Sequence, residues 1–411
     1  MTSDRAPATT PAPRRTLASH RLWLAGETER LLDFARGARV EEGFGWLDDD
    51  GRPDPSRPPQ LLVATRMTHV FALGSLLGVP GCGPLADHGL RAIIDVFEDD
   101  DLGGWFAEVA AGTGKDAYSH AFVLLAAAGA AIAGRPGAGA LLDRITGVVE
   151  QRFWSDQEGA CVEAWDREWR RPEDYRGANA NMHMVEAFLA ARDATGEAVW
   201  SERALRIAER LVRDVAAAHG WRVVEHFDAH WTPLPDYNRD DPRHPFRPFG
   251  VTPGHALEWS RLLLHLHASL DDPRPDWLIP AARALFARAL DDGWAANGGF
   301  VYTTDLEGRS VATERMHWVL TEAIGAAAAL HTVTAADEYD RSYQTFWDVA
   351  DAQFRDRERG SWRHELDERL QPSDRTWTGK PDVYHALQAT LIPRLPVTAS
   401  LAGALRDGLL A

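Results

Sequence analysis

Apolar residues recur along the chain at the three- and four-residue spacing of an amphipathic helix, in stretches that Gly, Pro and polar residues separate. Each stretch is long enough for a helix of a globular protein. The pattern predicts twelve helices in six pairs, at residues 17–38, 65–78, 84–97, 116–133, 141–154, 181–193, 198–218, 255–270, 277–290, 313–331, 338–354 and 381–391.

A short segment with glycine, an aromatic residue and an acidic residue recurs between the predicted helix pairs. Its copies return about every 60 residues, with one longer interval. Each copy is short, alternating and bounded by turn residues, which is typical of a β-hairpin. The copies begin at Gly43, Gly103, Gly159, Gly220, Gly298 and Gly360.

Six helical hairpins that must each bury an apolar face do so most economically as a closed double ring, with one helix of each pair inside. We therefore expect an all-α fold, an (α/α)6 barrel with short β-hairpins in the connecting loops. An open solenoid is the alternative, but such arrays need polar capping repeats and show tighter repeat similarity. Residues 1–16 are expected to form a disordered tail, and residues 17–411 a single catalytic domain.

The helix that follows each hairpin begins with polar and ionisable residues in all six repeats. Inner helices of a barrel are surrounded by other helices, so these side chains must face one another or lack partners. We expect them to form a pocket at one end of the barrel. The candidates are Arg66, His69, Tyr118, His120, Asn179, Asn181, His183, His255, Glu258, Glu314, Arg315, His317, Glu322, Lys380, Asp382, His385 and Gln388.

Histidine dominates this set, and an imidazole with a pKa near 6.5 can both take and return a proton at neutral pH. That chemistry suits moving a hydrogen alpha to a carbonyl. His255 and Glu258, three apart on one helix face, are expected to pair, the carboxylate fixing the imidazole tautomer; the alternative is a surface ion pair. The candidate histidines lack the i, i+4 spacing of a helical zinc site, so we expect catalysis without a metal.

The composition of the chain limits the kinds of partner that it can bind. The chain of 411 residues is 45% hydrophobic and 26% charged, as in folded proteins, and its net charge of −17 disfavours nucleic acid. Cys82 and Cys161 lie far apart and fit buried apolar positions better than a disulfide. Residues 1–15 contain no apolar leader core, and no apolar run reaches the length of a membrane span. We expect a cytoplasmic monomer or homodimer with a small-molecule substrate.

Three motifs resemble the N-acylglucosamine 2-epimerase superfamily, within it the mannose isomerase and sulfoquinovose isomerase branch. They are Asn179-Ala-Asn-Met-His-Met-Val-Glu-Ala, Pro245-Phe-Arg-Pro-Phe-Gly-Val-Thr-Pro-Gly-His-Ala-Leu-Glu-Trp and Gly379-Lys-Pro-Asp-Val-Tyr-His-Ala. The resemblance runs from about residue 17 to 396. It implies an (α/α)6 barrel with a cofactor-free site that interconverts D-mannose and D-fructose, with D-lyxose and D-xylulose as a second pair.

The resemblance also implies roles for single residues. His385 would be the main acid/base in a reaction through a cis-enediol, His255 with Glu258 would open the sugar ring and shuttle protons, and His183 would position the substrate. The expected substrate-binding residues are Arg66, Tyr118, Asn179, Glu322 and Trp318. The chain lacks a phosphate-cradling Gly-rich loop, so nucleotide dependence is not implied.

Several alternatives stay open at this point. A mannose/glucose 2-epimerase would use the same imidazoles, and a sulfoquinovose isomerase would need a cation for the sulfonate, for which Arg66, Arg315 and Lys380 are candidates. A glycosidase needs two opposed carboxylates, which histidines outnumber here, and a non-catalytic sugar-binding barrel is a further possibility. The segment 236–248, directly before His255, is either a lid over the pocket or an ordinary Pro-stiffened loop.

Overall fold

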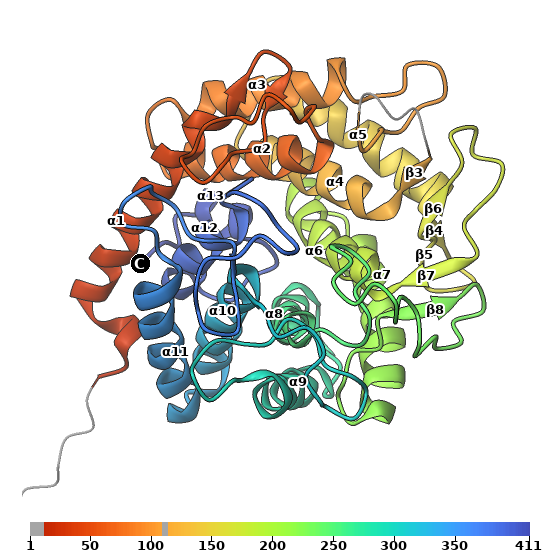
Figure 1. The fold of residues 1–411 in the computed structure, drawn as a ribbon. Coiled ribbons are helices and arrows are strands. Elements are labelled where there is room, and N and C mark those ends of the chain that lie inside the picture. Colours follow the sequence, from red (N-terminus) through yellow and green to blue (C-terminus); the bar gives the residue numbers. More distant parts are fainter. Residues whose placement is uncertain (1–11, 109–113) are drawn as a thin grey trace, which may run out of the picture.

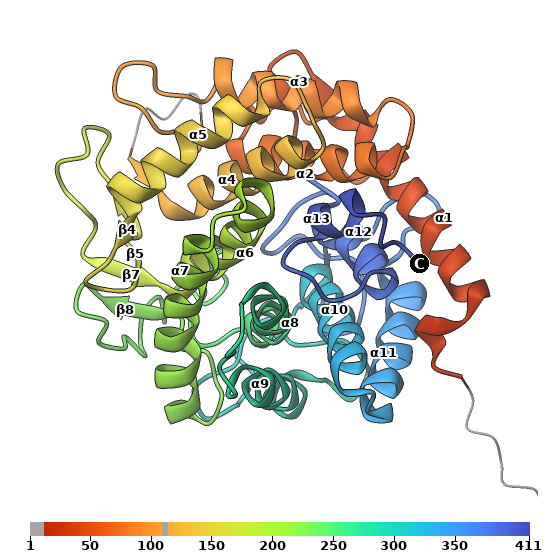
Figure 2. The ribbon, with the colours of Figure 1, turned by 180° about the vertical axis from the view of Figure 1, so that it is seen from behind.

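A computed structural model describes residues 12–108 and 114–411, and within them the helices form two concentric rings (Figure 1; from behind in Figure 2). The inner ring consists of α2 (Leu61–Leu76), α4 (Ala117–Ile132), α6 (Ala178–Thr195), α8 (Pro253–Ser269), α10 (His317–Thr334) and α12 (Tyr384–Leu391). The outer ring consists of α1 (Ala18–Ala35), α3 (Cys82–Asp95), α5 (Ala138–Val148), α7 (Val199–Ala208), α9 (Leu278–Gly293) and α11 (Asp337–Val349). Each inner helix contacts the next, and α12 closes the ring against α2. The predicted (α/α)6 barrel is confirmed.

Hydrophobic patterning explains which helix of a pair lies inside. The inner helix α4 is buried on nearly every face, and its sequence is apolar almost throughout. The outer helix α11 buries Tyr339, Tyr343, Phe346 and Trp347, which fall on one stripe at helical spacing, and exposes much of its other face. A helix covered on all sides needs the first pattern, and a helix with one face in water needs the second.

A further short helix, α13 (Leu401–Arg406), was not predicted. It contacts α2, α4 and α6, with Leu401 and Leu405 buried. Ser400 caps it by accepting a hydrogen bond from the Gly403 N–H at 3.0 Å, and the Ser400 hydroxyl donates to Asp193, near the end of α6, at 2.6 Å. The helix thus covers the barrel at the end where the inner helices terminate.

The predicted hairpins are confirmed for most copies of the repeat. β1 (Arg39–Val40) pairs with β2 (Gly43–Phe44), and β4 (Trp154–Ser155) pairs with β5 (Ala160–Cys161). Single bridges make equivalent turns at Glu98–Trp105, Trp294–Phe300 and Arg355–Trp362. At the copy that begins at Gly220, the described residues show no such local bridge, because the chain leaves a 3₁₀ turn at Ala217–His219 and pairs elsewhere.

Loops of consecutive repeats also pair with each other, which the sequence did not predict. β3 (Lys115–Asp116) pairs with β6 (Ala164–Trp165), β7 (Tyr175–Gly177) with β8 (His226–Asp228), and β9 (Arg315–Met316) with β10 (Glu365–Leu366). As a result, the first N–H of α6 donates to the Glu225 carbonyl at 2.9 Å and that of α10 to the His364 carbonyl at 3.0 Å. Each such contact ties the start of an inner helix to the loop of the next repeat.

The acidic residue that ends several repeat copies closes a second tight turn. Asp305 Oδ1 accepts the N–H groups of Glu307 at 3.0 Å and Arg309 at 2.9 Å, and Asp48, Asp228 and Asp367 do the same for their own turns. The third residue after the aspartate has positive φ, a conformation that glycine adopts without strain at Gly308 (φ 85°). The aspartates therefore build the loops around the barrel mouth.

The residues just before position 17, where the catalytic domain was predicted to begin, form an ordered segment. Arg14–Thr16 form a 3₁₀ turn, in which the Arg14 N–H donates to Asp340 at 3.0 Å and Arg15 Nε donates to His331 at 2.7 Å. Residues 1–11 of the predicted tail lie outside the described residues. Cys82 and Cys161 are buried free thiols. In the described parts of the chain, no helix combines the length and apolar character that crossing a membrane requires.

Candidate active site

A pocket lies where the inner helices begin, enclosed by the repeat loops. Most of the predicted site residues line it, namely Arg66, Tyr118, Asn179, His183, His255, Glu258, Trp318 and His385. The structure brings these residues to one pocket, and His317 and Asp382 of the predicted polar set line it as well. Residues of the loops complete the lining, namely Trp46, Pro245, Phe246, Pro248, Tyr302, His364, Trp377 and Pro381, together with Leu62, Val63, His317 and Asp382.

Other members of the predicted polar set do not reach the pocket. His120 accepts the Trp105 N–H at 3.1 Å and packs on Phe153, toward the outer loops. Lys380 donates to Asp356 at 2.8 Å, and Arg315 donates to the Thr313 carbonyl. The expectation was wrong for these residues and for His69, Asn181, Glu314, Glu322 and Gln388, because a helix turn also points side chains toward neighbouring helices and loops.

Glu322 lies beneath the pocket and supports His385. Its Oε1 is 3.1 Å from His385 Nδ1, and its Oε2 accepts a hydrogen bond from Arg261 Nε at 2.8 Å. Burial alone would raise the pKa of this carboxyl, but Arg261 and His385 outweigh it and lower the pKa to about 2. An ionised Glu322 accepts only, so His385 Nδ1 must carry the proton and Nε2 is the free basic nitrogen.

His255 is supported by Glu225, not by Glu258 as predicted. Its Nδ1 lies 2.8 Å from Glu225 Oε1, which also accepts the Thr252 N–H at 3.3 Å. Glu225 belongs to the repeat copy that begins at Gly220. The β7–β8 pairing ties its backbone to the start of α6, and its side chain reaches the start of α8. The acidic residue of that repeat copy was the feature of the sequence that could have identified Glu225 as the partner of His255. Glu163 occupies the same position one repeat earlier and accepts the Gly177 N–H at 3.0 Å.

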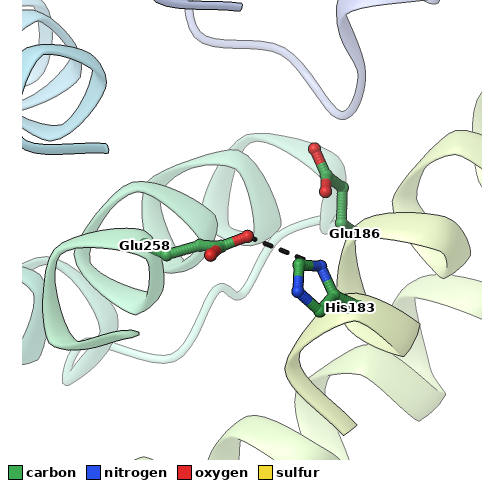
Figure 3. A group of neighbouring side chains, drawn as sticks. All are labelled: His183, Glu186 and Glu258. Atoms are coloured by element: carbon green, nitrogen blue, oxygen red, sulfur yellow. Dashed lines mark ion pairs between the residues drawn. The ribbon is translucent and has the colours of Figure 1, made fainter. Parts of the chain in front are cut away.

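Glu258 faces His183 instead, as Figure 3 shows. Its Oε1 is 3.7 Å from His183 Nδ1, and both atoms are buried without a hydrogen-bond partner. Burial, reinforced by the nearby charge of Glu322, raises the pKa of Glu258 well above its usual range. Burial, with the charge of Arg66, lowers the pKa of His183 well below its usual range. Both shifts favour the neutral forms of the two side chains.

Arg66 is held between two partners. Its guanidinium donates to Asp382 Oδ2 at 3.2 Å and to the Tyr118 hydroxyl at 2.9 Å. It is the only arginine or lysine among the described residues that line the pocket. Asp382, which balances this charge, was in the predicted polar set but not among the predicted substrate-binding residues.

Trp318 forms a wall shared by two histidines. Its ring centroid lies 5.3 Å from that of His255 and 5.9 Å from that of His385. Gly254 permits this approach, because a Cβ atom there would lie 2.5 Å from the Trp318 ring. An indole between two imidazoles is a surface on which a sugar ring can stack.

Trp46, Trp377 and His364, which help to roof the pocket beside the predicted Phe246 and His317, were not predicted as site residues. Trp46 stacks on Trp377 at 6.0 Å, and Trp377 meets the edge of Phe246 at 5.4 Å. His317 and His364 stack with centroids 3.8 Å apart. The loop residues Trp46, Trp377 and His364 carry no helical periodicity that would have placed them here.

The segment 236–248 lies over the pocket, as the lid hypothesis requires. Asn179 Nδ2 donates to the Phe246 carbonyl at 3.3 Å, and the Tyr302 hydroxyl donates to the Pro245 carbonyl at 3.3 Å. Arg243 Nε donates to the buried Glu314 at 2.8 Å, and Arg375 donates to the same oxygen at 3.0 Å. Two loops are thus joined through one carboxylate. That the segment opens and closes stays a prediction.

One group of side chains has the spacing of metal ligands. His183, Glu186 and Glu258 each offer an atom within 4.8 Å of the others (Figure 3). The guanidinium of Arg261 lies 3.6 Å from Glu258 and 3.7 Å from Glu186, so a cation already occupies the electrostatic role that a metal would have. Glu186 also accepts hydrogen bonds from Tyr384 and Gln388. The donor set fits a metal poorly.

A helical barrel with histidine–glutamate pairs and aromatic walls around one pocket is typical of an enzyme that acts on a small polar molecule.

Comparison with known proteins gives the family. A profile described as N-acylglucosamine 2-epimerase (GlcNAc 2-epimerase) matches residues 43–389. The chain is 54% identical over 397 residues to the D-mannose isomerase of Thermobifida fusca. This alignment covers 94% of this chain and 97% of the relative. It is 50% identical over 395 residues to the D-mannose isomerase of Pseudomonas cannabina pv. alisalensis, covering 94% and 95%. A crystal structure of a D-mannose isomerase superposes with a TM-score of 0.83 at 29% identity, covering 90% of this chain and 96% of that one. The chain belongs to the N-acylglucosamine 2-epimerase family, a family of sugar isomerases and epimerases.

Proposed function

We propose that this protein interconverts D-mannose and D-fructose through a cis-enediol, with D-lyxose and D-xylulose as a second substrate pair. The two similar relatives named D-mannose isomerase support the substrate. The observation that carries the chemistry is the placement of His385 and His255 beside Trp318 in one pocket, each with Nδ1 on its own glutamate. Each imidazole is thus held with Nε2 free for proton transfer.

In the proposed reaction, His255 moves a proton from the O1 hydroxyl to the ring oxygen, which opens the pyranose. His385 Nε2 then removes the proton from C2, and the cis-enediol forms as its enediolate, with the negative charge on O1. His255 Nε2 takes the proton of the O2 hydroxyl and passes it to O1, and His385 returns its proton to C1. The ketose results, and both imidazoles end as they began.

The other pocket residues bind and orient the sugar in this proposal. The neutral Glu258 donates a hydrogen bond to a substrate oxygen, and the neutral His183 positions the same part of the sugar. Arg66, Tyr118 and Asn179 bind hydroxyl groups, and Trp318 stacks on the sugar face. Glu322 acts through His385, since both of its oxygens are already engaged below the pocket.

The proposed reaction needs no metal, because the charge that a metal would supply near Glu258 and Glu186 comes from Arg261. The proposed substrates carry no anionic group, because Arg66 is neutralised by Asp382, and Arg315 and Lys380 lie outside the pocket. A sulfonate or phosphate would therefore find no free cation among the described lining residues. A single catalytic domain at 17–411, a cytoplasmic location and a monomer or homodimer remain part of the proposal.

A mannose/glucose 2-epimerase is the second candidate, because both reactions share the enediol. His255 and His385 both lie beside Trp318 in the same pocket, and in the epimerase His255 would return a proton to the other face of C2. The two functions differ only in where the proton is returned.

Product analysis tests the proposal. Purified protein is treated with EDTA and incubated with D-mannose, and the products are followed by ¹³C NMR. We expect D-fructose at a rate that added Mg²⁺, Mn²⁺ or Zn²⁺ does not increase. D-glucose as the main product would replace the isomerase with the epimerase, and activity only after metal addition would refute the metal-free mechanism.

A further inference from the structure

Below the pocket, one arginine lies among three buried glutamates that come from three inner helices. Arg261 of α8 donates to Glu322 of α10 at 2.8 Å, and its terminal nitrogens lie 3.6 Å from Glu258 and 3.7 Å from Glu186 of α6. Arg261, Glu258 and Glu322 are each at most 2% exposed. Arg261, Glu258 and Glu322 are thus shielded from water, whereas Glu186 keeps a side-chain exposure of 11%.

Charge balance limits the protonation of the three carboxyls. One guanidinium cannot neutralise three buried carboxylates, and an unbalanced buried charge is costly. Glu322 accepts hydrogen bonds from Arg261 and His385, and Glu186 accepts them from Tyr384 and Gln388. Glu258 Oε1 has no hydrogen-bond partner. Glu258 is therefore the member of the cluster that holds a proton.

We propose that Arg261 is a positioning residue that couples the His385–Glu322 pair to the His183–Glu258 pair, so that charge gained at one pair is felt at the other. Its hydrogen bond keeps Glu322 ionised behind His385, while its remaining contacts do not suffice to ionise Glu258. When His385 is protonated, the hydrogen bond between Glu322 and His385 becomes stronger and the one between Glu322 and Arg261 becomes weaker. The guanidinium of Arg261 then turns toward Glu258. The proposal rests on the proposed function for its catalytic meaning.

Titratable and charged groups face Arg261 from every inner helix packed around it. They are Arg66 and His69 of α2, His183 and Glu186 of α6, Glu258 and His265 of α8, Glu322 of α10, and Tyr384 and His385 of α12. Burial lowers the pKa of His69 and of His265 to about 4, so both stay neutral at the pH of catalysis. Arg66 is balanced by Asp382. The coupling therefore acts mainly among the three glutamates and the two pocket histidines beside them.

Substitution of Arg261 gives a signature that simple loss of structure would not. Arg261→Gln removes the cation, so Glu322 takes up a proton at a higher pH and His385 loses its charged partner there. We expect the acid limb of the kcat profile to move up by at least one pH unit, which costs roughly tenfold in kcat per unit below the limb. KM for mannose should change less than about threefold, because Arg261 does not line the pocket. Arg261→Lys, which keeps the charge, should restore most of the profile.

Arg355→Gln is the matched control, because Arg355 pairs at 2.8 Å with the buried Glu27, away from the pocket. It should lower the melting temperature without moving the pH profile. An Arg261→Gln profile with the wild-type acid limb, at whatever overall rate, would overturn the proposal. If Arg261→Gln does not fold, Arg261→Met, which also removes the charge but keeps a long side chain, carries the test, and a wild-type acid limb in that variant would overturn the proposal.

A measurement without turnover separates this proposal from the proposed function. In protein with ¹³C-labelled glutamate carboxyls, NMR titration should show the pKa of Glu322 raised in Arg261→Gln relative to wild type. An unshifted Glu322 resonance would overturn the coupling even in an active enzyme. A wild-type protein that does not isomerise any aldose but shows the shift would overturn the proposed function and leave the coupling intact.

Discussion

Replacing Glu225 with Gln tests whether the support of His255 matters for catalysis. The Glu225–His255 contact is 2.8 Å long and buried, with Glu225 4% exposed and His255 7% exposed. A hydrogen bond to a charged partner contributes about 1.5–3 kcal/mol, and one between neutral groups about 0.5–1.5 kcal/mol. The amide keeps the shape and an acceptor but loses the charge, so roughly 1–2 kcal/mol of imidazolium stabilisation should disappear.

That loss corresponds to a fall in kcat of about 5- to 30-fold. The assay is D-fructose formation from D-mannose under saturating substrate, with KM measured alongside. Glu163→Gln is the matched control, because Glu163 also accepts the N–H of a residue that precedes an inner helix but touches no pocket histidine. Its kcat should stay near that of the wild type. A Glu225→Gln enzyme within twofold of wild type, or an equal loss in Glu163→Gln, would refute the assigned role of Glu225.

Two further predictions concern stability and access to the pocket. Burial raises the pKa of Glu163 from 4.5 to about 7 in the folded state, so the stability it contributes is present below pH 4.5 and is lost as pH rises through 7. The pKa shift corresponds to roughly 3 kcal/mol of unfolding free energy. The melting temperature of Glu163→Gln should therefore fall less than that of wild type between pH 5 and 8. Parallel curves of melting temperature against pH for the two proteins would contradict this. Arg243→Ala removes the hydrogen bond to Glu314 that joins segment 236–248 to its neighbour. We expect KM for mannose to rise about threefold, while the melting temperature changes by only a degree or two because the arginine is partly exposed. Arg239→Ala, in the same segment, is the control and should change neither quantity. An unchanged KM in Arg243→Ala would argue against a lid.

Helix positions could be predicted because apolar periodicity is local information. The twelve predicted stretches correspond to α1 through α12, but some boundaries differ. α2 begins at Leu61 instead of residue 65, because the Leu61 N–H donates to the Ala107 carbonyl of the next repeat at 3.0 Å. α13 is too short to show a period, and its burial depends on the ends of α2, α4 and α6. Contacts of this kind do not appear in a local pattern.

The sequence could predict many of the residues that form the candidate site, but not which of them contact each other. Helical spacing correctly placed Glu258 and His255 toward one pocket, yet it could not show that the side chain of Glu225, from the loop of another repeat, lies closer to the imidazole. The same limit applies to Glu322, which was expected to touch substrate and instead lies between His385 and Arg261. A side chain's partner depends on three-dimensional neighbours from other repeats, and a single sequence gives only the face from which it projects.

In the proposed reaction, His385 is the base that removes the proton from C2 of the sugar. Wild-type and His385→Asn protein are incubated with D-mannose in D₂O, and the C2 hydrogen is followed by NMR. We expect the wild type to exchange that hydrogen as fructose forms, and the variant to lose exchange by roughly a thousandfold or more while mannose still raises its melting temperature. Exchange at a near-wild-type rate in His385→Asn would contradict the account, because another group would then be the base.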